Sequence, residues 1–338
     1  MNALHASLPI RVLAVAVGAC LCTGTASAAA QRLVTVDSDS GLNVVEVGQL
    51  DFSSLDASPS YQFSVNAFVG GWAVSSSSFR GEIYTFDKAF RYRGQLARKG
   101  IGPGETSGVP HVVSINGRTL IVDPGNKKLI LLDSADAFLS EIPIQGRISS
   151  VESIGSIVAI GGQFSSNGKL HRISFFNPDS ARQVFALPSD DNGPFFVGEV
   201  VVGSNANSIW TIAEAGGLIS QLARSSLQIV SQAQLPPPYA ASQESYDPAE
   251  ARPPARVLGA TAAGQVALIY FAVADRTWSR GNTDPESIYD TEIVSVDIDR
   301  MVIIGINRFD GFCQPLEGWI GACLDTATGN LSLFRLQY

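Results

Sequence analysis

The chain has 338 residues, of which 45% are hydrophobic and 16% charged, and its net charge is -8. This apolar content supports a large core and excludes a disordered chain. The acidic residues are scattered and no basic face is clustered, which excludes a nucleic-acid binder and a polybasic membrane-binding surface.

The N-terminus has the three features of a secretory signal peptide. Arg11 supplies a positive charge, Val12–Leu21 is a short apolar run, and small residues with an A-x-A pattern follow at Ala26–Ala28. The run is too short to cross a bilayer core of about 30 Å, which favours a cleaved signal over a membrane anchor. We therefore expect residues 1–30 to be a signal peptide and the mature chain to be periplasmic or secreted, with no transmembrane segment.

A second interpretation of the N-terminus places a lipid at Cys20. The segment Val17-Gly18-Ala19-Cys20 loosely resembles the lipobox that precedes the lipidated cysteine of bacterial lipoproteins. A lipid anchor at Cys20 therefore stands as the alternative to soluble export.

Beyond residue 30 the sequence consists of short apolar runs separated by turn-forming Gly, Asn, Asp and Ser. The clearest unit, residues 112–144, reads VVSIN, TLIVD, KKLILLD and FLSEIPI, which predicts a meander of four strands. Similar units precede and follow it, and most are spaced by roughly 40 to 46 residues, the period of four-stranded propeller blades. Their third strands end near Asp87, Asp133, Phe176, Leu222, Val296 and Leu336.

The last unit contains only three strands, RFDGFC, GWIGACL and LSLFRLQ. A ring of blades must close, and the runs LVTV and LNVVEV within residues 33–47 offer the missing outer strand. We therefore predict an all-β, six-bladed propeller over residues 31–338, a single domain in which an N-terminal strand completes the last blade. A pair of β-sandwiches is the alternative fold.

One part of the chain resembles the NHL-like six-bladed propellers, a TolB-like fold. The resemblance rests on GEIYTFD, RGQLARKGIGPGE and RTLIVDPGNKKLILLD within residues 81–144. A G-x-G-P-G-E loop before a new blade and a strand-ending Asp before a turn with Asn are typical of that family. The resemblance implies the propeller fold. It leaves function open, because members include scaffolds, ligand-binding modules and some hydrolases or lyases.

Two long insertions interrupt the blade pattern, at residues 236–254 and 275–290. Long loops in a compact domain are usually functional or disordered. The second insertion carries Arg276, Trp278, Arg280 and Tyr289. Arginine and aromatic side chains are frequent anchors in binding sites, so these four are candidate ligand-binding residues.

Histidines are few in the mature chain. His111 precedes an inner strand, where propeller pockets open, and is a candidate ligand-binding residue, whereas His171 lies within a predicted strand and is expected to be structural. The sequence contains no G-x-S-x-G serine elbow and no H-E-x-x-H zinc motif. We therefore assign no catalytic residue.

Cys313 and Cys323 flank a turn-like segment, and strands paired on either side would bring them together. An oxidising compartment would allow a disulfide between them. No metal-binding motif accompanies these cysteines, so no metal ligand and no cofactor are predicted there. Asp37-Ser38-Asp39-Ser40-Gly41 has part of the ligand spacing of a Ca²⁺ loop but lacks its later acidic ligands, which makes Ca²⁺ the one candidate ion.

These features together predict an exported propeller that acts as a non-catalytic binding or scaffold module. Its partner would be a protein, a peptide or a glycan. The alternative is a metal-dependent hydrolase or lyase of the lactonase-like propeller type, with oxygen ligands converging at the central channel.

Overall fold

The structure is a computed structural model that describes residues 31–33, 35–36, 42–53, 55, 57–68, 70–189, 198–214, 217–239, 255–274, 289–325 and 328–337. The regular secondary structure of these residues is β-strand apart from one short 3-10 helix, η1 (Ser77–Phe79). No helix in this part of the chain is long and apolar enough to cross a membrane.

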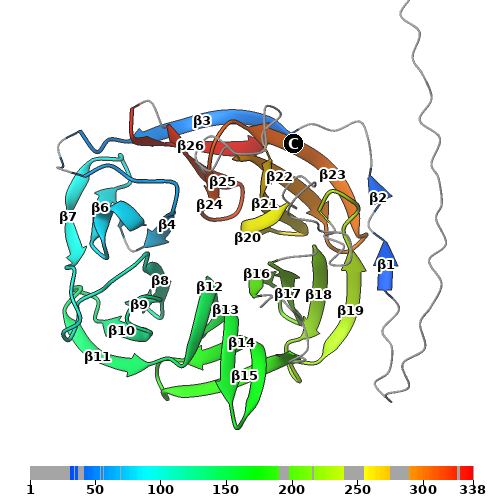
Figure 1. Ribbon diagram of the computed structural model, residues 1–338, viewed down its shortest axis with the longest axis horizontal. Helices are drawn as coiled ribbons and strands as arrows, with labels where there is room; N and C mark the ends of the chain where they lie inside the picture. Colours follow the sequence, from blue (N-terminus) through cyan, green and yellow to red (C-terminus); the bar gives the residue numbers. More distant parts are fainter. Residues whose placement is uncertain are drawn as a thin grey trace, which may run out of the picture.

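The strands form six blades arranged in a ring around a central axis (Figure 1). We use channel for the region along this axis, between the inner strands. Each blade is an antiparallel meander of four strands, with its first strand innermost and its last strand outermost in blades 1 to 5. The predicted six-bladed propeller is therefore confirmed. Blade 1 contains β4 (Phe63–Phe68), β5 (Gly71–Ser76), β6 (Ile83–Asp87) and β7 (Tyr92–Ala97); blade 2 contains β8 (His111–Ile115), β9 (Arg118–Asp123), β10 (Lys128–Leu132) and β11 (Phe138–Pro143).

The other four blades follow in chain order and return to blade 1, because the inner strands of neighbouring blades are in contact around the whole ring. Blade 3 contains β12 (Gly146–Ile154), β13 (Ile157–Ser166), β14 (Lys169–Asn177) and β15 (Arg182–Ser189); blade 4 contains β16 (Glu199–Ser204), β17 (Ser208–Ala213), β18 (Leu218–Ala223) and β19 (Ile229–Gln234); blade 5 contains β20 (Arg256–Ala263), β21 (Val266–Ala274), β22 (Tyr289–Asp297) and β23 (Val302–Phe309); blade 6 contains β24 (Cys313–Pro315), β25 (Ile320–Asp325), β26 (Asn330–Gln337) and β3 (Asn43–Leu50).

The hydrophobic core is divided among the faces that neighbouring blades present to each other. Within the described residues, the six apolar clusters correspond to the six blade-to-blade interfaces. On β9, Ile121 packs toward blade 1 while its neighbours Leu120 and Val122 pack toward blade 3. Successive side chains of a strand point to opposite faces, so a strand buried on both faces must be apolar throughout. This explains the continuous apolar runs in the sequence.

The N-terminal segment closes the ring and also follows its outer rim. Strand β3 pairs antiparallel with β26, which confirms that an N-terminal strand completes the last blade. Ahead of it, β1 (Gln31–Leu33) pairs in parallel with β19 of blade 4, and β2 (Thr35–Val36) pairs in parallel with β23 of blade 5. Figure 1 shows β1 and β2 outside these two blades. These two additional edge pairings were not predicted from the sequence.

The loop Gly100–Glu105 connects β7 to β8, as its sequence predicted for a blade-to-blade connection. Gly102 N–H donates to the Glu105 carboxylate at 2.8 Å, and Lys128 Nζ donates to the Gly102 carbonyl at 2.7 Å. The Asn126 side chain also donates to the Gly100 carbonyl at 2.8 Å. The loop is therefore fixed by blade 2.

Blade 6 contains the predicted disulfide. Cys313 of β24 and Cys323 of β25 lie directly opposite each other in the antiparallel register and are bonded, with 4.0 Å between their Cα atoms. One predicted boundary is wrong in this region. Arg308 and Phe309 of the run RFDGFC end β23 of blade 5, and β24 begins only at Cys313.

Candidate binding face around the channel

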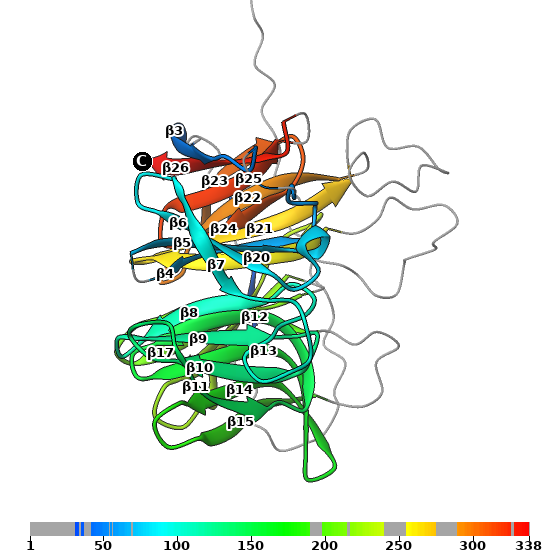
Figure 2. The same cartoon turned by 90° about the vertical axis from the view of Figure 1, so that its left-hand side faces the viewer.

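The inner strands begin at the same end of the ring, which we call the top face; it lies to the right in Figure 2. The opposite end is the bottom face. At this end, His111 at the start of β8 contacts Ser64 near the start of β4. Arg147 and Arg256, near the starts of β12 and β20, pair with Glu214, which follows β17. Polar and charged side chains from blades 1 to 5 therefore gather around the top of the channel.

The central element of this face is a buried carboxylate shared by two arginines. Glu214 follows β17 in blade 4, and its side chain is 10% exposed. Its Oε1 atom accepts from Arg147 of blade 3 at 3.2 Å and from Arg256 of blade 5, and its Oε2 atom accepts from Ser149 Oγ at 3.1 Å. Gly198 leaves room for this arrangement, since a Cβ there would lie 2.3 Å from Oε2. Glu214 thus joins three consecutive blades.

A second carboxylate lies deeper, at the start of the inner strand of blade 4. Glu199 is fully buried, and its Oε1 atom accepts from Thr211 Oγ1 at 2.6 Å. Its Oε2 atom lies 3.1 Å from Arg172 Nη1, which is ion-pair distance without hydrogen-bond alignment. Burial raises the pKa of Glu199, and Arg172 and Thr211 oppose that shift. The group links blade 4 to β14 of blade 3.

His111, a predicted ligand-binding residue, is the first residue of β8 and is half-buried. Ser64 Oγ donates to Asn66 Oδ1 at 3.0 Å and lies 3.2 Å from His111 Nδ1, so the Nδ1–H group of His111 donates a hydrogen bond to Ser64 Oγ. Burial lowers the pKa of His111 to about 4, which keeps the ring neutral at neutral pH. The structure places His111 on the top face, and its ligand contact remains a prediction.

Blade 5 adds a charged group in which one arginine serves two acids. Arg308 donates to Asp290 at 2.6 Å through Nη2 and to Glu292 at 3.1 Å through Nη1. Tyr239 Oη donates to the second oxygen of Glu292 at 2.7 Å. Burial and the Glu292 carboxylate raise the pKa of Tyr239, so the phenol stays protonated. Among the described residues of this group, one arginine pairs with two carboxylates, whereas around Glu214 two arginines pair with one carboxylate.

The bottom end of the channel is acidic. Glu152 lies near the end of β12, and Glu317 lies in the turn after β24, on the blade opposite in the ring. Burial raises the pKa of Glu152 to about 7, and the Glu317 charge adds to this shift. In the part of the chain that the structure describes, no three His, Cys, Asp or Glu residues are grouped closely enough to hold a metal ion.

Several predicted positions lie outside the described residues: Arg276, Trp278, Arg280, the candidate Ca²⁺ loop at 37–41, Cys20 and the rest of residues 1–30. Tyr289 begins β22, but its side chain is outside the described part. His171 lies on β14 with its ring 5.5 Å from that of Phe185. Of the described residues that flank the insertions, Ala274 ends β21 and Tyr289 begins β22, whereas Tyr239 lies in a turn after β19 and Ala255 directly precedes β20.

Sequence reasoning missed Arg147, Glu199, Glu214 and Arg256. Glu214 is 67 residues from Arg147 and 42 from Arg256, so no short motif contains the group. One signal was available, because Arg147, Glu199 and Arg256 each stand at the first or second position of an inner strand. A charged residue at that position has to lie at the channel mouth.

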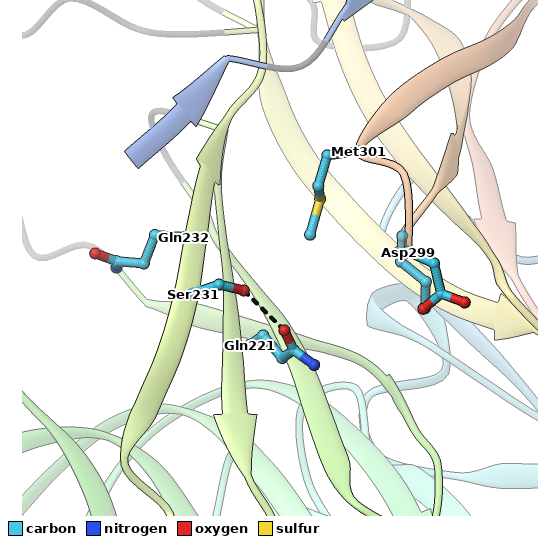
Figure 3. A pocket seen from close by; sticks show the side chains of 6 residues that line it. Gln221, Ser231, Gln232, Asp299 and Met301 are labelled. Atoms are coloured by element: carbon cyan, nitrogen blue, oxygen red, sulfur yellow. Dashed lines mark hydrogen bonds between the residues drawn. The ribbon is translucent and has the colours of Figure 1, made fainter. Parts of the chain in front are cut away.

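A separate hollow of about 210 Å³ lies between the outer parts of blades 4 and 5 (Figure 3). Its polar side chains are engaged with one another: Ser231 Oγ donates to Gln221 at 2.7 Å, and the Gln232 amide donates to Ser220 at 3.1 Å. Figure 3 shows Gln232 turned away from Met301 and Asp299. Gln221, Ser231 and Gln232 are therefore already hydrogen-bonded within blade 4. Its lining residues are Gln221, Ser231, Gln232, Ile298, Asp299 and Met301.

Comparisons with known proteins identify the fold class. No family model matches the chain, and no curated protein matches it. Among solved structures it is similar to a DUF4221 family member from Bacteroides vulgatus, with a TM-score of 0.61, 10% identity and 88% of this chain and 98% of that chain covered. It is also similar to a candidate exported protein from Bacteroides fragilis, with a TM-score of 0.58, 11% identity and 91% and 99% coverage. The β-propeller domain of Cps50 (Swd1) from Myceliophteria thermophila gives a TM-score of 0.50 at 10% identity, with 87% and 99% covered. These likenesses, at 10 to 11% identity, support the β-propeller fold, whose six blades the strand order shows, and no finer family.

Proposed function

We propose that this chain is an exported, non-catalytic recognition module that binds its partner on the top face of the propeller. The observation that carries the proposal is the gathering of half-exposed polar and charged side chains around the channel mouth, from His111 on blade 2 to Arg256 on blade 5. Charged groups on a rigid ring of strands are held in fixed positions, which favours recognition.

Export is supported by the signal-peptide pattern of residues 1–30 and by the likeness to a candidate exported protein. A propeller partner outside the cytoplasm would be a protein, a peptide or a glycan. The NHL-like resemblance is compatible with this role, since scaffolds and binding modules are common among such propellers.

The alternative function, a metal-dependent hydrolase or lyase, needs oxygen ligands that converge near the axis. Glu152 and Glu317 are the described carboxylates that influence each other inside the channel. Elemental analysis of the dialysed exported protein tests this alternative. About one tightly held divalent ion per chain would favour it.

The proposal is tested by blocking the top face independently of ligand chemistry. Arg256→Cys, whose parent side chain is 59% exposed, is labelled with a bulky maleimide; Cys313 and Cys323 are bonded to each other and do not react. Labelled protein is then applied to peptide and glycan arrays. The matched control is labelled Arg118→Cys, because Arg118 is similarly exposed at 42% but lies on the bottom face.

We expect the label at position 256 to abolish binding to the array and the label at position 118 to leave it unchanged. Equal binding by both labelled proteins would contradict a top-face recognition role. The unlabelled Arg256→Cys protein separates the loss of one arginine from the blocking of the whole face.

A further inference from the structure

We propose that Arg147 and Arg256 form a binding site for a carboxylate group of an acidic peptide. This inference rests on the proposed function and specifies which ligand chemistry the top face recognises. It is carried by the geometry around Glu214, where two half-exposed guanidinium groups from different blades are held together by one buried acid.

The two arginines are fixed from below. Both reach the same oxygen of Glu214, whose other oxygen is held by Ser149. Glu214 is itself anchored, because its N–H donates to the Gly198 carbonyl at 2.9 Å and its carbonyl accepts from Val257 N–H at 3.2 Å. The guanidinium groups are therefore positioned before a ligand arrives, which reduces the entropy lost on binding.

The charges of the group are unbalanced. Two arginines share a single carboxylate, while Arg308 on the same face is paired with two acids, Asp290 and Glu292. The side chains of Arg147 and Arg256 are 51% and 59% exposed. Each guanidinium has five N–H donors, and one from each is bonded within the described residues. The half-exposed guanidinium groups therefore keep N–H donors that are not bonded within the described residues, and a second anion would balance the charge.

A carboxylate is the anion that this geometry favours. Each arginine uses only its Nη2 group on Glu214 Oε1, and planar guanidinium groups bind carboxylates through paired hydrogen bonds of their N–H groups. A peptide is favoured over an acidic glycan, because sugar rings are usually held against an aromatic face. None of the exposed large apolar side chains of the described chain lies on an inner strand.

The test is a calorimetric titration of the purified exported protein with pentaglutamate. Pentaglutamine with an acetylated N-terminus and an amidated C-terminus is the control without a carboxylate, oligogalacturonate presents carboxylates on a glycan, and inorganic phosphate presents a different anion. We expect pentaglutamate to bind and pentaglutamine not to bind. Arg147→Ala and Arg256→Ala should each weaken pentaglutamate binding by about ten-fold or more, as loss of a hydrogen bond to a charged group does. Arg118→Ala should leave it unchanged.

Each alanine variant leaves Glu214 paired with the other arginine and with Ser149, so both variants should stay folded, which a melting curve recorded alongside the titration checks. Binding of oligogalacturonate or phosphate without pentaglutamate would overturn the acidic-peptide assignment, and so would equal affinity of Arg147→Ala and the parent protein. If the label at position 256 abolishes array binding but pentaglutamate does not bind, the top-face function stands and this inference fails.

Discussion

The two ends of the channel differ in the charged groups that surround their acidic side chains, and strand β12 runs from one end to the other. At the top end, Glu199 lies beside Arg172, and Glu214 lies beside Arg147 and Arg256. At the bottom end, Glu152 is influenced by Glu317, and neither has a cationic partner among the described residues. The ends differ in chemistry although the same inner strands line both. Binding of an anion is therefore expected at the top and binding of a proton at the bottom.

The largest expected effect is the loss of Glu199. Glu199→Ala removes a fully buried acid and leaves Arg172, whose side chain is 19% exposed, without its partner. Breaking such a buried pair lowers the free energy of unfolding by about 3 to 5 kcal/mol. Urea unfolding at neutral pH measures the change.

The matched control for this variant is Asp179→Ala, since Asp179 is 51% exposed and pairs with Arg118 on the surface. Loss of that pair should change stability by less than about 1 kcal/mol. Equal losses of unfolding free energy in the two variants would show that the buried ion pair at the top end stabilises the fold no more than the surface pair does.

A smaller effect is expected from Glu152→Gln, with a pH dependence that identifies its cause. The pKa of Glu152 is raised from 4.5 to about 7, so the folded state binds this proton more tightly than the unfolded chain. The parent protein should lose stability as pH rises through this range. Because Glu152 is partly exposed to the channel, the loss should be about 1 to 2 kcal/mol.

This pH dependence is tested by measuring the free energy of unfolding below and above this pH range, for the parent protein and for Glu152→Gln. The variant should lack this decrease at higher pH. A parent and a variant with the same pH dependence would mean that the bottom of the channel is hydrated well enough to keep Glu152 ionised.

The smallest effect concerns His111 and runs in the opposite direction. Its pKa is lowered from 6.5 to about 4, so the folded state disfavours the protonated ring, and stability is lost as pH falls through this range. The loss should be about 1 kcal/mol, reduced because the ring is only half-buried. His111→Gln should remove it, and an NMR titration of the ring should show a midpoint near the lowered value. A midpoint at the usual value would contradict the burial of this histidine.

Much of the fold was predictable because its signals are local. Buried strands such as Arg118–Asp123 and Lys128–Leu132 are continuous apolar runs bounded by turn residues, and their spacing repeats along the chain. The three-stranded last unit predicted that an N-terminal strand would close the ring. The parallel pairings of β1 and β2 were not predictable, because two very short strands carry no pattern that selects blades 4 and 5.

The candidate site was less predictable, for a related physical reason. His111 could be selected because it directly precedes an apolar run. The group of Arg147, Glu214 and Arg256 forms only when three blades stack side by side, and its members are far apart in the sequence. Spacing therefore carries no information about their contact, and the position of a charge at the start of an inner strand is the only sequence signal.

The most direct test of the top-face site is NMR of the arginine Nε–Hε groups during addition of pentaglutamate. We predict that the signals of Arg147 and Arg256 shift in a saturable manner while those of Arg118 and Arg91, which pair with acids elsewhere on the surface, stay in place. Shifts of the same size for all four arginines, or saturable shifts confined to Arg118 and Arg91, would contradict the site.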